Sequence, residues 1–255
     1  MNLDGKKILI TGGCGFIGSR LAEQLSSNNN VTIVDRSSNH VGVEGIERIE
    51  VIEGDLSDPA VVEMAITSET DIIFHLAADK AVNSENITAQ FDLNNRMTSN
   101  ILSRMKDVGV TNIAFASSST VYGEADCPTS ENYTPLEPIS VYGASKLASE
   151  ALVSAYAYGF DYTTWTFRLA NVVGPRLRRG AVIPDFIEKL KKDPELLHVL
   201  GNGHQEKSYI YIEDCIEAMC WIVEMTSEPT NVYNIGTKTT ISVREIAEIV
   251  SNQMG

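Results

Sequence analysis

A tyrosine and a lysine four residues apart, in Tyr142-Gly-Ala-Ser-Lys146, are the residues of this chain best suited to chemistry. On a helix this spacing puts the phenol and the ammonium on one face. A tyrosine is a poor base at neutral pH, since its pKa is about 10, but a neighbouring ammonium, helped by a further cation, lowers that pKa. The pair therefore predicts a base that removes a proton from a hydroxyl group. On its own, the same spacing is also typical of a solvated helix surface.

A glycine-rich loop near the N-terminus gives this pair a context. The stretch Thr11-Gly-Gly-Cys-Gly-Phe-Ile-Gly18 stands between a predicted strand and a predicted helix. Glycines there allow a tight turn and a close approach of the backbone to a pyrophosphate, and the helix N-terminus offers N–H groups to the phosphates. Two registers fit the motif, Gly13-x-Gly15-x-x-Gly18 and Gly12-x-x-Gly15-x-x-Gly18. We therefore expect a dinucleotide at this loop.

An acidic residue, Asp35, closes the second predicted strand at the distance from the loop, about 20 residues, that a dinucleotide site requires. Its carboxylate can accept hydrogen bonds from the adenosine ribose and repel a 2′-phosphate, which favours NAD over NADP. Arg36 softens that repulsion, and a turn at the strand end is the structural alternative for Asp35. Asp55 follows the third predicted strand, where it either reaches the adenine or caps the next helix with Ser57 and Asp58.

Composition and charge exclude several classes of protein. The chain of 255 residues is 43% hydrophobic and 21% charged, as in soluble globular proteins of one large domain or one domain with a small lobe. No apolar run approaches the roughly 20 residues that span a bilayer, and the N-terminus leads directly into a strand, so we expect a cytoplasmic protein without a membrane span. The net charge of −14 argues against nucleic-acid binding. The four cysteines lack metal-ligand spacing, and we expect no metal.

Short apolar runs alternate with helix-period segments over most of the chain, which is typical of a doubly wound parallel sheet covered on both faces. Predicted strands cover 7–10, 31–34, 49–52, 71–76, 112–117, 162–168 and 232–235, and predicted helices cover 16–25, 59–66, 91–108 and 142–158. Residues 171–206 are rich in proline and glycine around one predicted helix (183–192) and a short predicted strand (198–200). We therefore expect a nucleotide domain of residues 1–170, to which 207–234 return, and a small substrate lobe of 171–206 and 235–255.

Five motifs occur in order at the expected intervals. They are Thr11-Gly-Gly-Cys-Gly-Phe-Ile-Gly18, Gly54-Asp-Leu56, His75-Leu-Ala-Ala78, Ser117-Ser-Ser-Thr-Val-Tyr-Gly123 and Tyr142-Gly-Ala-Ser-Lys146. Together they resemble the extended short-chain dehydrogenase/reductase family, in its NAD-dependent nucleotide-sugar epimerase/dehydratase branch. The resemblance covers nearly the whole chain. It implies an α/β Rossmann fold with a small C-terminal substrate lobe and NAD as the cofactor.

The resemblance also assigns roles at the reacting end. Tyr142 would be the catalytic base or acid, and Lys146 would bind the nicotinamide ribose and depress the pKa of Tyr142. Ser118 would hydrogen-bond the reacting sugar oxygen. Lys80 is similar to a lysine that UDP-galactose 4-epimerases place near the cofactor, and Asn95 resembles an asparagine that positions the cofactor or the serine. The cofactor-binding residues implied in full are Gly12, Gly15, Phe16, Ile17, Gly18, Asp35, Arg36, Asp55, Leu56, Leu76, Ala77, Ala78, Lys80, Asn95, Ser117, Tyr142 and Lys146.

The implied substrate site departs from the family pattern. The implied substrate-binding residues are Ser118, Asn171, Arg176, Arg178, Arg179 and Lys207. An arginine cluster in an otherwise acidic chain suits a nucleotide diphosphate, although a solvated loop is the alternative. Family members usually carry Arg-Asp-Phe or Arg-Asp-Tyr where this chain has Lys207-Ser-Tyr209, and lysine lacks the bidentate geometry of arginine. They also continue beyond the position of Gly255, so the substrate lobe is expected to be minimal or truncated.

The residues beside Ser118 decide between reactions. A 4,6-dehydratase usually has Asp-Glu there to act as acid and base, whereas this chain has Ser119-Thr120. Epimerisation needs only the tyrosine and serine with a tightly held NAD, so the hypothesis is a 4-epimerase of the UDP-glucose/UDP-galactose type. A decarboxylase, a dehydratase, an epimerase/reductase and a non-catalytic NAD sensor are the alternatives. The predicted helices 91–108 and 142–158 would form a homodimer face, or else pack against the sheet.

Overall fold

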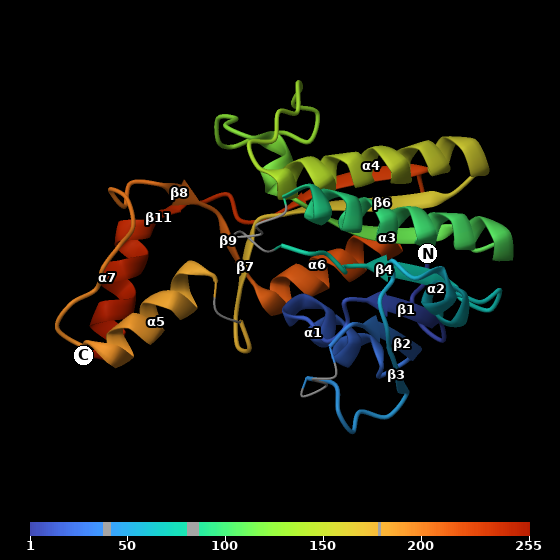
Figure 1. The fold of residues 1–255 in the computed structure, drawn as a ribbon, viewed down its shortest axis with the longest axis horizontal. Coiled ribbons are helices and arrows are strands. Elements are labelled where there is room, and N and C mark those ends of the chain that lie inside the picture. Colours follow the sequence, from blue (N-terminus) through green and yellow to red (C-terminus); the bar gives the residue numbers. More distant parts are fainter. Residues whose placement is uncertain (38–41, 81–86, 178–179) are drawn as a thin grey trace. The chain divides into compact units, whose positions relative to one another are not determined.

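The computed structural model describes residues 1–37, 42–80, 87–177 and 180–255, which form two compact units (Figure 1). Unit 1 comprises Met1–Leu169 and Ile216–Ile235, and unit 2 comprises Ala170–Cys215 and Gly236–Gly255. Residues 207–215, which the sequence assigned to the nucleotide domain, belong to unit 2. The reason is a strand pairing, since Asn171–Val173 (β7) forms a parallel pair with Tyr209–Tyr211 (β9).

Unit 1 is built on a seven-stranded sheet in the order β10-β6-β5-β4-β1-β2-β3, and every pair of neighbours is parallel. Its strands are β1 (Lys7–Thr11), β2 (Asn30–Asp35), β3 (Ile49–Glu53), β4 (Ile72–His75), β5 (Asn112–Ser118), β6 (Thr163–Leu169) and β10 (Thr230–Ile235). The predicted doubly wound α/β fold is confirmed. The order reverses between β1 and β4, and such a switch point opens a ligand crevice at the carboxyl ends of the strands.

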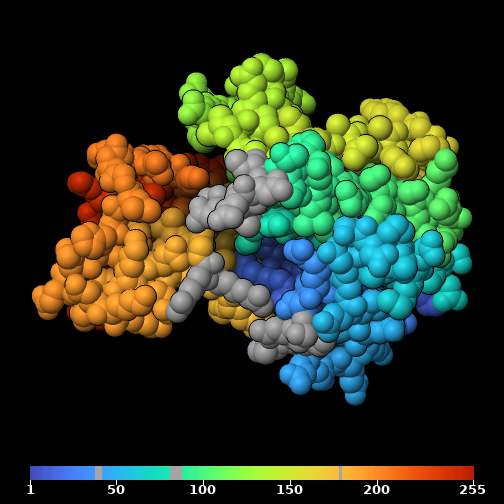
Figure 2. All heavy atoms as spheres, in the orientation of Figure 1, coloured from blue at the N-terminus to red at the C-terminus, as the bar shows by residue number. Residues whose placement is uncertain are grey.

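Helices cover both faces of this sheet. They are α1 (Phe16–Leu25), α2 (Pro59–Ala65), α3 (Ile87–Val108), α4 (Val141–Phe160) and, partly in unit 2, α6 (Ile212–Met225). The inner sides of α2, α3 and α4 share one hydrophobic core with the sheet, to which Ile101 and Val153 contribute. The helices α3 and α4 lie side by side (Figures 1 and 2). The alternative of burial against the sheet is therefore correct for their inner faces.

Unit 2 has a core of its own, formed by the apolar faces of α5 (Val182–Lys192) and α7 (Val243–Met254). Beside the β7–β9 pair it contains an antiparallel pair of β8 (Glu206–Lys207) and β11 (Ile241–Ser242). The predicted helix over 183–192 is present, but the predicted strand over 198–200 is wrong. Val199 packs against the core of unit 2, but Leu200 is 87% exposed and precedes Gly201 at φ +77°, so the chain turns there and the segment has no strand pairing.

Membrane-spanning helices are absent from the part of the chain that the structure describes, since none of its helices is long and apolar enough to cross a bilayer.

Candidate active site

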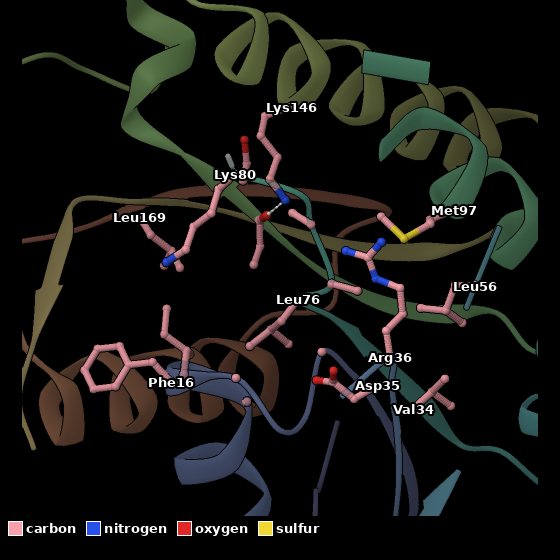
Figure 3. A pocket seen from close by; sticks show the side chains of 18 of the residues that line it. Phe16, Val34, Asp35, Arg36, Leu56, Leu76, Lys80, Met97, Lys146 and Leu169 are labelled. Carbon is pink, nitrogen blue, oxygen red and sulfur yellow. Dashed lines mark hydrogen bonds between the residues drawn. The ribbon is translucent and has the colours of Figure 1, made fainter. Parts of the chain in front are cut away.

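A pocket of about 320 Å³ opens in unit 1 at the carboxyl ends of the strands around the β1/β4 switch point (Figure 3). Every cofactor-binding residue expected from the sequence lines it, with two exceptions, Asp55 and Asn95. Five further residues line the pocket that sequence reasoning missed: Val34, Gly54, Met97, Ala116 and Leu169. Four of these lie within or directly after a strand, so strand ends next to the motifs were the available signal. Met97 comes from α3 and carried no such signal.

Two glycines of the loop, Gly12 and Gly18, have no room for a side chain because the protein backbone lies too close. Gly12 has φ +69°, and a Cβ there would lie 2.9 Å from the backbone of Ala77. A Cβ on Gly18 would lie 2.3 Å from the Gly12 carbonyl oxygen. The helix α1 then begins at Phe16, and its N-cap, Gly15, makes no side-chain cap. The first-turn N–H groups of α1 are therefore left for a ligand, and an anion is the ligand that they attract.

Asp35 is held at the pocket wall by two backbone donors. The N–H groups of Cys14 and Ser37 donate to its two carboxylate oxygens, each at 2.9 Å. Because a carboxylate oxygen accepts more than one hydrogen bond, the group keeps acceptor capacity for ribose hydroxyls. Figure 3 shows the neighbouring Arg36 extending from the strand end toward Met97.

Asp55 sits just outside the lining. Its Oδ1 accepts the Ser57 N–H at 2.8 Å, and its Oδ2 lies 3.9 Å from Nη1 of Arg36. The helix cap of α2 is Asp58, which accepts the Ala60 N–H at 2.9 Å. Asp55 therefore stabilises the turn before the helix and pairs with Arg36.

Tyr142 and Lys146 lie in the first two turns of α4, which is capped by the Ser140 hydroxyl at the Gly143 N–H. Lys146 is only 3% exposed, and its Nζ donates to the Ala116 carbonyl at 2.7 Å (dashed in Figure 3). The same Nζ lies 5.8 Å from the centroid of the Tyr142 ring. The phenol and the ammonium therefore share one face of the helix, and both line the pocket.

Burial is the largest influence on the pKa values of Tyr142 and Lys146. It raises the pKa of Tyr142 to about 12. It also lowers the pKa of Lys146 to about 7, against an opposing effect from Glu150. A phenolate at neutral pH therefore requires a further positive charge in the pocket, because an opposite charge favours the ionised form of a phenol.

His75 forms a buried polar connection behind the pocket. Its Nδ1 lies 2.8 Å from Thr11 Oγ1 and its Nε2 lies 3.0 Å from Thr98 Oγ1. Burial, together with the charge of Lys146, lowers the pKa of His75 to about 3, so the ring is neutral at ordinary pH. Thr98 Oγ1 is in turn 3.1 Å from Ser149 Oγ. Strands β1 and β4 are thereby joined to α3 and α4 through neutral hydrogen bonds.

Asn94, which the sequence did not single out, joins the pocket wall to the helix of Tyr142. The Asn94 side chain accepts the Asp79 N–H at 2.7 Å and donates to the Asp79 carbonyl and to Ser145 Oγ, both at 3.0 Å. The Nδ2 of Asn95 donates to its own helix at Phe91 O, 2.8 Å away, and its Oδ1 accepts the Ser149 hydroxyl of α4 at 3.2 Å. Spacing was the available signal, because Asn94, Thr98 and Ile101 share the buried stripe of α3.

The two serine hydroxyls at the end of β5, those of Ser117 and Ser118, make different contacts. Ser117 lines the pocket and donates to the Glu150 carboxylate. Ser118 is half-buried, does not line the pocket, and accepts the Thr120 N–H at 3.3 Å. Ser119 and Thr120 are exposed, so no carboxylate follows Ser118 in the structure or the sequence.

The expected substrate residues that the structure describes beyond Ser118 belong to unit 2. Asn171 is exposed and donates to the Ser208 carbonyl at 3.2 Å, and Lys207 is exposed in β8. Arg176, at φ +72°, lines a second pocket of about 670 Å³ between β7 and α5. Arg178 and Arg179 lie outside the described residues.

Comparisons with known proteins agree with this geometry. The model of the NAD dependent epimerase/dehydratase family matches residues 8–236. A solved UDP-galactose 4-epimerase is 40% identical, with a TM-score of 0.87 over 96% of this chain and 82% of that chain. The UDP-glucose 4-epimerase of Thermus thermophilus, solved in complex with NAD, is 28% identical, with a TM-score of 0.87 over 98% of this chain and 83% of that one. The human dTDP-D-glucose 4,6-dehydratase is 28% identical over 95% of this chain and 72% of its own length.

Proposed function

The chain belongs to the NAD-dependent epimerase/dehydratase family, and on that premise we propose that it is a 4-epimerase of a UDP-glucose/UDP-galactose-type sugar nucleotide. The observation that carries the proposal is the constellation of Tyr142 and Lys146 at the pocket with no carboxylate beside Ser118. These groups suffice to take and return one proton, and they lack the added acid and base of a dehydration.

The residues of the pocket fit NAD, the cofactor of the family. The bare backbone at Gly12 and Gly18 and the open first turn of α1 suit the pyrophosphate. Asp35, oriented by two N–H groups, would hold the adenosine ribose, and Lys146 would hold the ribose at the reacting end. When bound, NAD would supply reversible hydride exchange with the sugar carbon, so no external reductant would be consumed.

The protein's own groups would handle the proton. The Tyr142 phenolate takes the proton of the C4 hydroxyl as that carbon is oxidised, and the phenol returns it when the ketone is reduced on its other face. The Lys146 ammonium and the positive charge of the oxidised nicotinamide both favour the phenolate over the phenol, which offsets the effect of burial. Ser118 would hold the sugar oxygen during both steps. Proton transfer of this kind contributes about 10²–10⁴-fold to a rate.

We assign the nucleotide diphosphate to cations of unit 2. Arg176 lines the pocket between β7 and α5, and Lys207 stands exposed on β8. A guanidinium and an ammonium are the side chains that bind phosphates best, although lysine does so without a bidentate grip. Asn171 would add an amide contact.

Pairing of two chains across the outer faces of α3 and α4 is part of the proposal. The inner faces of these helices are committed to the core, whereas Tyr158 of α4 is 77% exposed. Sedimentation-velocity measurement of the purified protein's mass tests whether two chains pair. A monomer at micromolar concentration contradicts it.

The decisive experiment is product analysis with Tyr142→Phe. We expect the purified protein to interconvert UDP-glucose and UDP-galactose, and Tyr142→Phe to abolish turnover while mass spectrometry still finds NAD on the protein. Tyr133→Phe, at an exposed tyrosine that lines neither pocket, is the matched control and should behave as the wild type.

Other outcomes identify the alternatives. A 4-keto-6-deoxy product identifies a dehydratase, carbon dioxide released from UDP-glucuronate identifies a decarboxylase, and NADPH consumption identifies an epimerase/reductase. Retained NAD without conversion of any sugar nucleotide identifies a sensor. Full activity in Tyr142→Phe contradicts the assigned chemistry.

A further inference from the structure

One turn beyond Lys146, helix α4 carries a buried ion pair that the chemistry described above does not use. Glu150 is 8% exposed and Arg168 of β6 is 6% exposed. Arg168 Nη2 lies 2.8 Å from Glu150 Oε2, and Arg168 Nε lies 3.1 Å from Glu150 Oε1. A buried pair of this kind is weak evidence for stability, because removing two charges from water offsets most of their attraction. Its position beside Lys146 indicates another use.

Neighbouring residues of β5 hold the lysine and the glutamate. Lys146 Nζ donates to the carbonyl of Ala116, and the hydroxyl of the next residue, Ser117, donates to the Glu150 carboxylate. Lys146 and Glu150 are also four apart on α4, so their side chains lie on one face of the helix. Ammonium, carboxylate and guanidinium therefore alternate in sign along the buried side of α4.

We propose that Glu150 is a positioning residue that keeps the Lys146 ammonium charged, and that Arg168 moderates this effect. The proposal rests on the proposed roles of Tyr142 and Lys146. It assigns to Glu150 no contact with substrate or cofactor. Glu150 would affect the reaction only by changing the charge of Lys146.

The other described groups that contact Lys146, and the side chains of the neighbouring hydrogen-bond network named here, carry no negative charge. From β4, His75 is neutral because burial holds its pKa near 3. From its own helix, Tyr142 is a phenol with a raised pKa, and from α3 the nearby side chains of the network are the amide of Asn94 and the hydroxyl of Thr98. From β5 come the Phe115 ring, 4.7 Å from Nζ, and a backbone carbonyl. Glu150 is the group that opposes the lowering of the Lys146 pKa by burial.

Removing Glu150 and removing its partner Arg168 are expected to shift the pKa of Lys146 in opposite directions. In Glu150→Gln the two buried cations lose the carboxylate that both have beside them, and arginine does not deprotonate in proteins, so Lys146 must lose its proton more easily. In Arg168→Gln the carboxylate faces Lys146 alone, so the ammonium is held more firmly. A purely structural ion pair would give no such reversal, since both variants would loosen the same packing.

The test is an NMR titration of the Lys146 ammonium. The protein is labelled with ¹³C and ¹⁵N lysine and prepared without NAD. The Lys146 signal is identified as the one that is missing in Lys146→Arg. We expect the midpoint to fall by roughly one pH unit or more in Glu150→Gln, and to rise in Arg168→Gln. Glu150→Asp keeps the charge and should restore most of the wild-type midpoint. Glu69→Gln removes an exposed carboxylate paired with Lys7 and should leave the midpoint unchanged.

An unchanged or raised midpoint in Glu150→Gln overturns the proposal, and so do shifts of one sign in both variants. Should Glu150→Gln fail to fold, Arg168→Gln decides alone, because a constant or lowered midpoint there contradicts the proposal. In active enzyme, the alkaline limb of turnover should move with the NMR midpoint. A wild-type protein that converts no sugar nucleotide overturns the proposed function, whereas an unmoved Lys146 midpoint overturns this inference.

Discussion

Lys146 is fixed beneath Tyr142, with its Nζ 5.8 Å from the centroid of the tyrosine ring and 2.7 Å from the carbonyl oxygen of Ala116. A lysine side chain ordinarily loses considerable rotamer freedom when it is held in one place. Here the carbonyl acceptor and the Phe115 ring, 4.7 Å from Nζ, define its position inside the protein. The charge that the phenol experiences is therefore set by the protonation of one immobilised ammonium.

Replacing Lys146 by methionine should lower turnover by roughly 10²–10⁴-fold, because Tyr142 then loses the cation that favours its phenolate. The turnover that remains should require a higher pH. The measurement is kcat and KM for the sugar nucleotide between pH 6 and 10. Lys106→Met is the matched control, since Lys106 also lies over an aromatic ring, that of Phe160 at 4.5 Å, but does not line the pocket. Wild-type turnover in Lys146→Met would contradict the assigned role.

Gly18→Ala should weaken NAD binding and destabilise the fold. The new Cβ would lie 2.3 Å from the Gly12 oxygen and 2.8 Å from Gly13 Cα, so the backbone must move, and overpacking of this kind costs roughly 1–3 kcal/mol. Gly159→Ala is the control within α4, where no atom lies within 4 Å of the added Cβ. It should stabilise the helix by up to about 1 kcal/mol. Denaturant unfolding and NAD titration check both variants, and equal behaviour of the two would disprove the steric argument.

Asp35→Asn should weaken NAD binding and reduce the preference for NAD over NADP. An amide cannot accept both the Cys14 and Ser37 N–H groups with two oxygens, and it no longer repels a 2′-phosphate, while Arg36 stays in the pocket. Calorimetric titration with NAD and with NADP measures the ratio of the two dissociation constants. Asp58→Asn, which preserves the cap of α2, should leave that ratio unchanged. A wild-type ratio in Asp35→Asn would refute this role of the carboxylate.

His75 should make the protein sensitive to acid. Its pKa is about 3 in the folded chain and 6.5 in an unfolded one, so only the unfolded state takes up the proton between these values. The stability from the neutral ring is complete above pH 6.5 and is lost as the pH falls toward 3, at about 1.4 kcal/mol per pH unit. His75→Gln should flatten this slope of the free energy of unfolding, whereas exposed His198→Gln should not. Urea unfolding at pH 7, 6, 5 and 4 measures it, and parallel slopes in wild type and His75→Gln would count against it.

Much of the fold could be predicted because its signals are local. Apolar runs of strand length alternate with helix-period segments, and the glycine loop, Asp35 and Tyr142–Lys146 each carry their chemistry within a few residues. The structure departs from the sequence predictions where a segment pairs with another that is distant in the chain. Residues 207–215 belong to unit 2 because β9 pairs with β7, and no local pattern contains that pairing. The hydrogen bonds of Asn94 to Asp79 and Ser145 likewise join residues that are distant in the chain.

The sequence by itself determined the α/β class, the NAD loop and the face that Tyr142 and Lys146 share, because helical and strand periods place side chains without knowledge of distant segments. Only the tertiary structure decided the charge environment of that face. Glu150 and Arg168 are 18 residues apart, in α4 and β6, and β5 brings Ser117 to the same carboxylate. The burial of Lys146 and the charge of Glu150 beside it depend on which distant segments pack together. These two influences set whether Lys146 carries its proton.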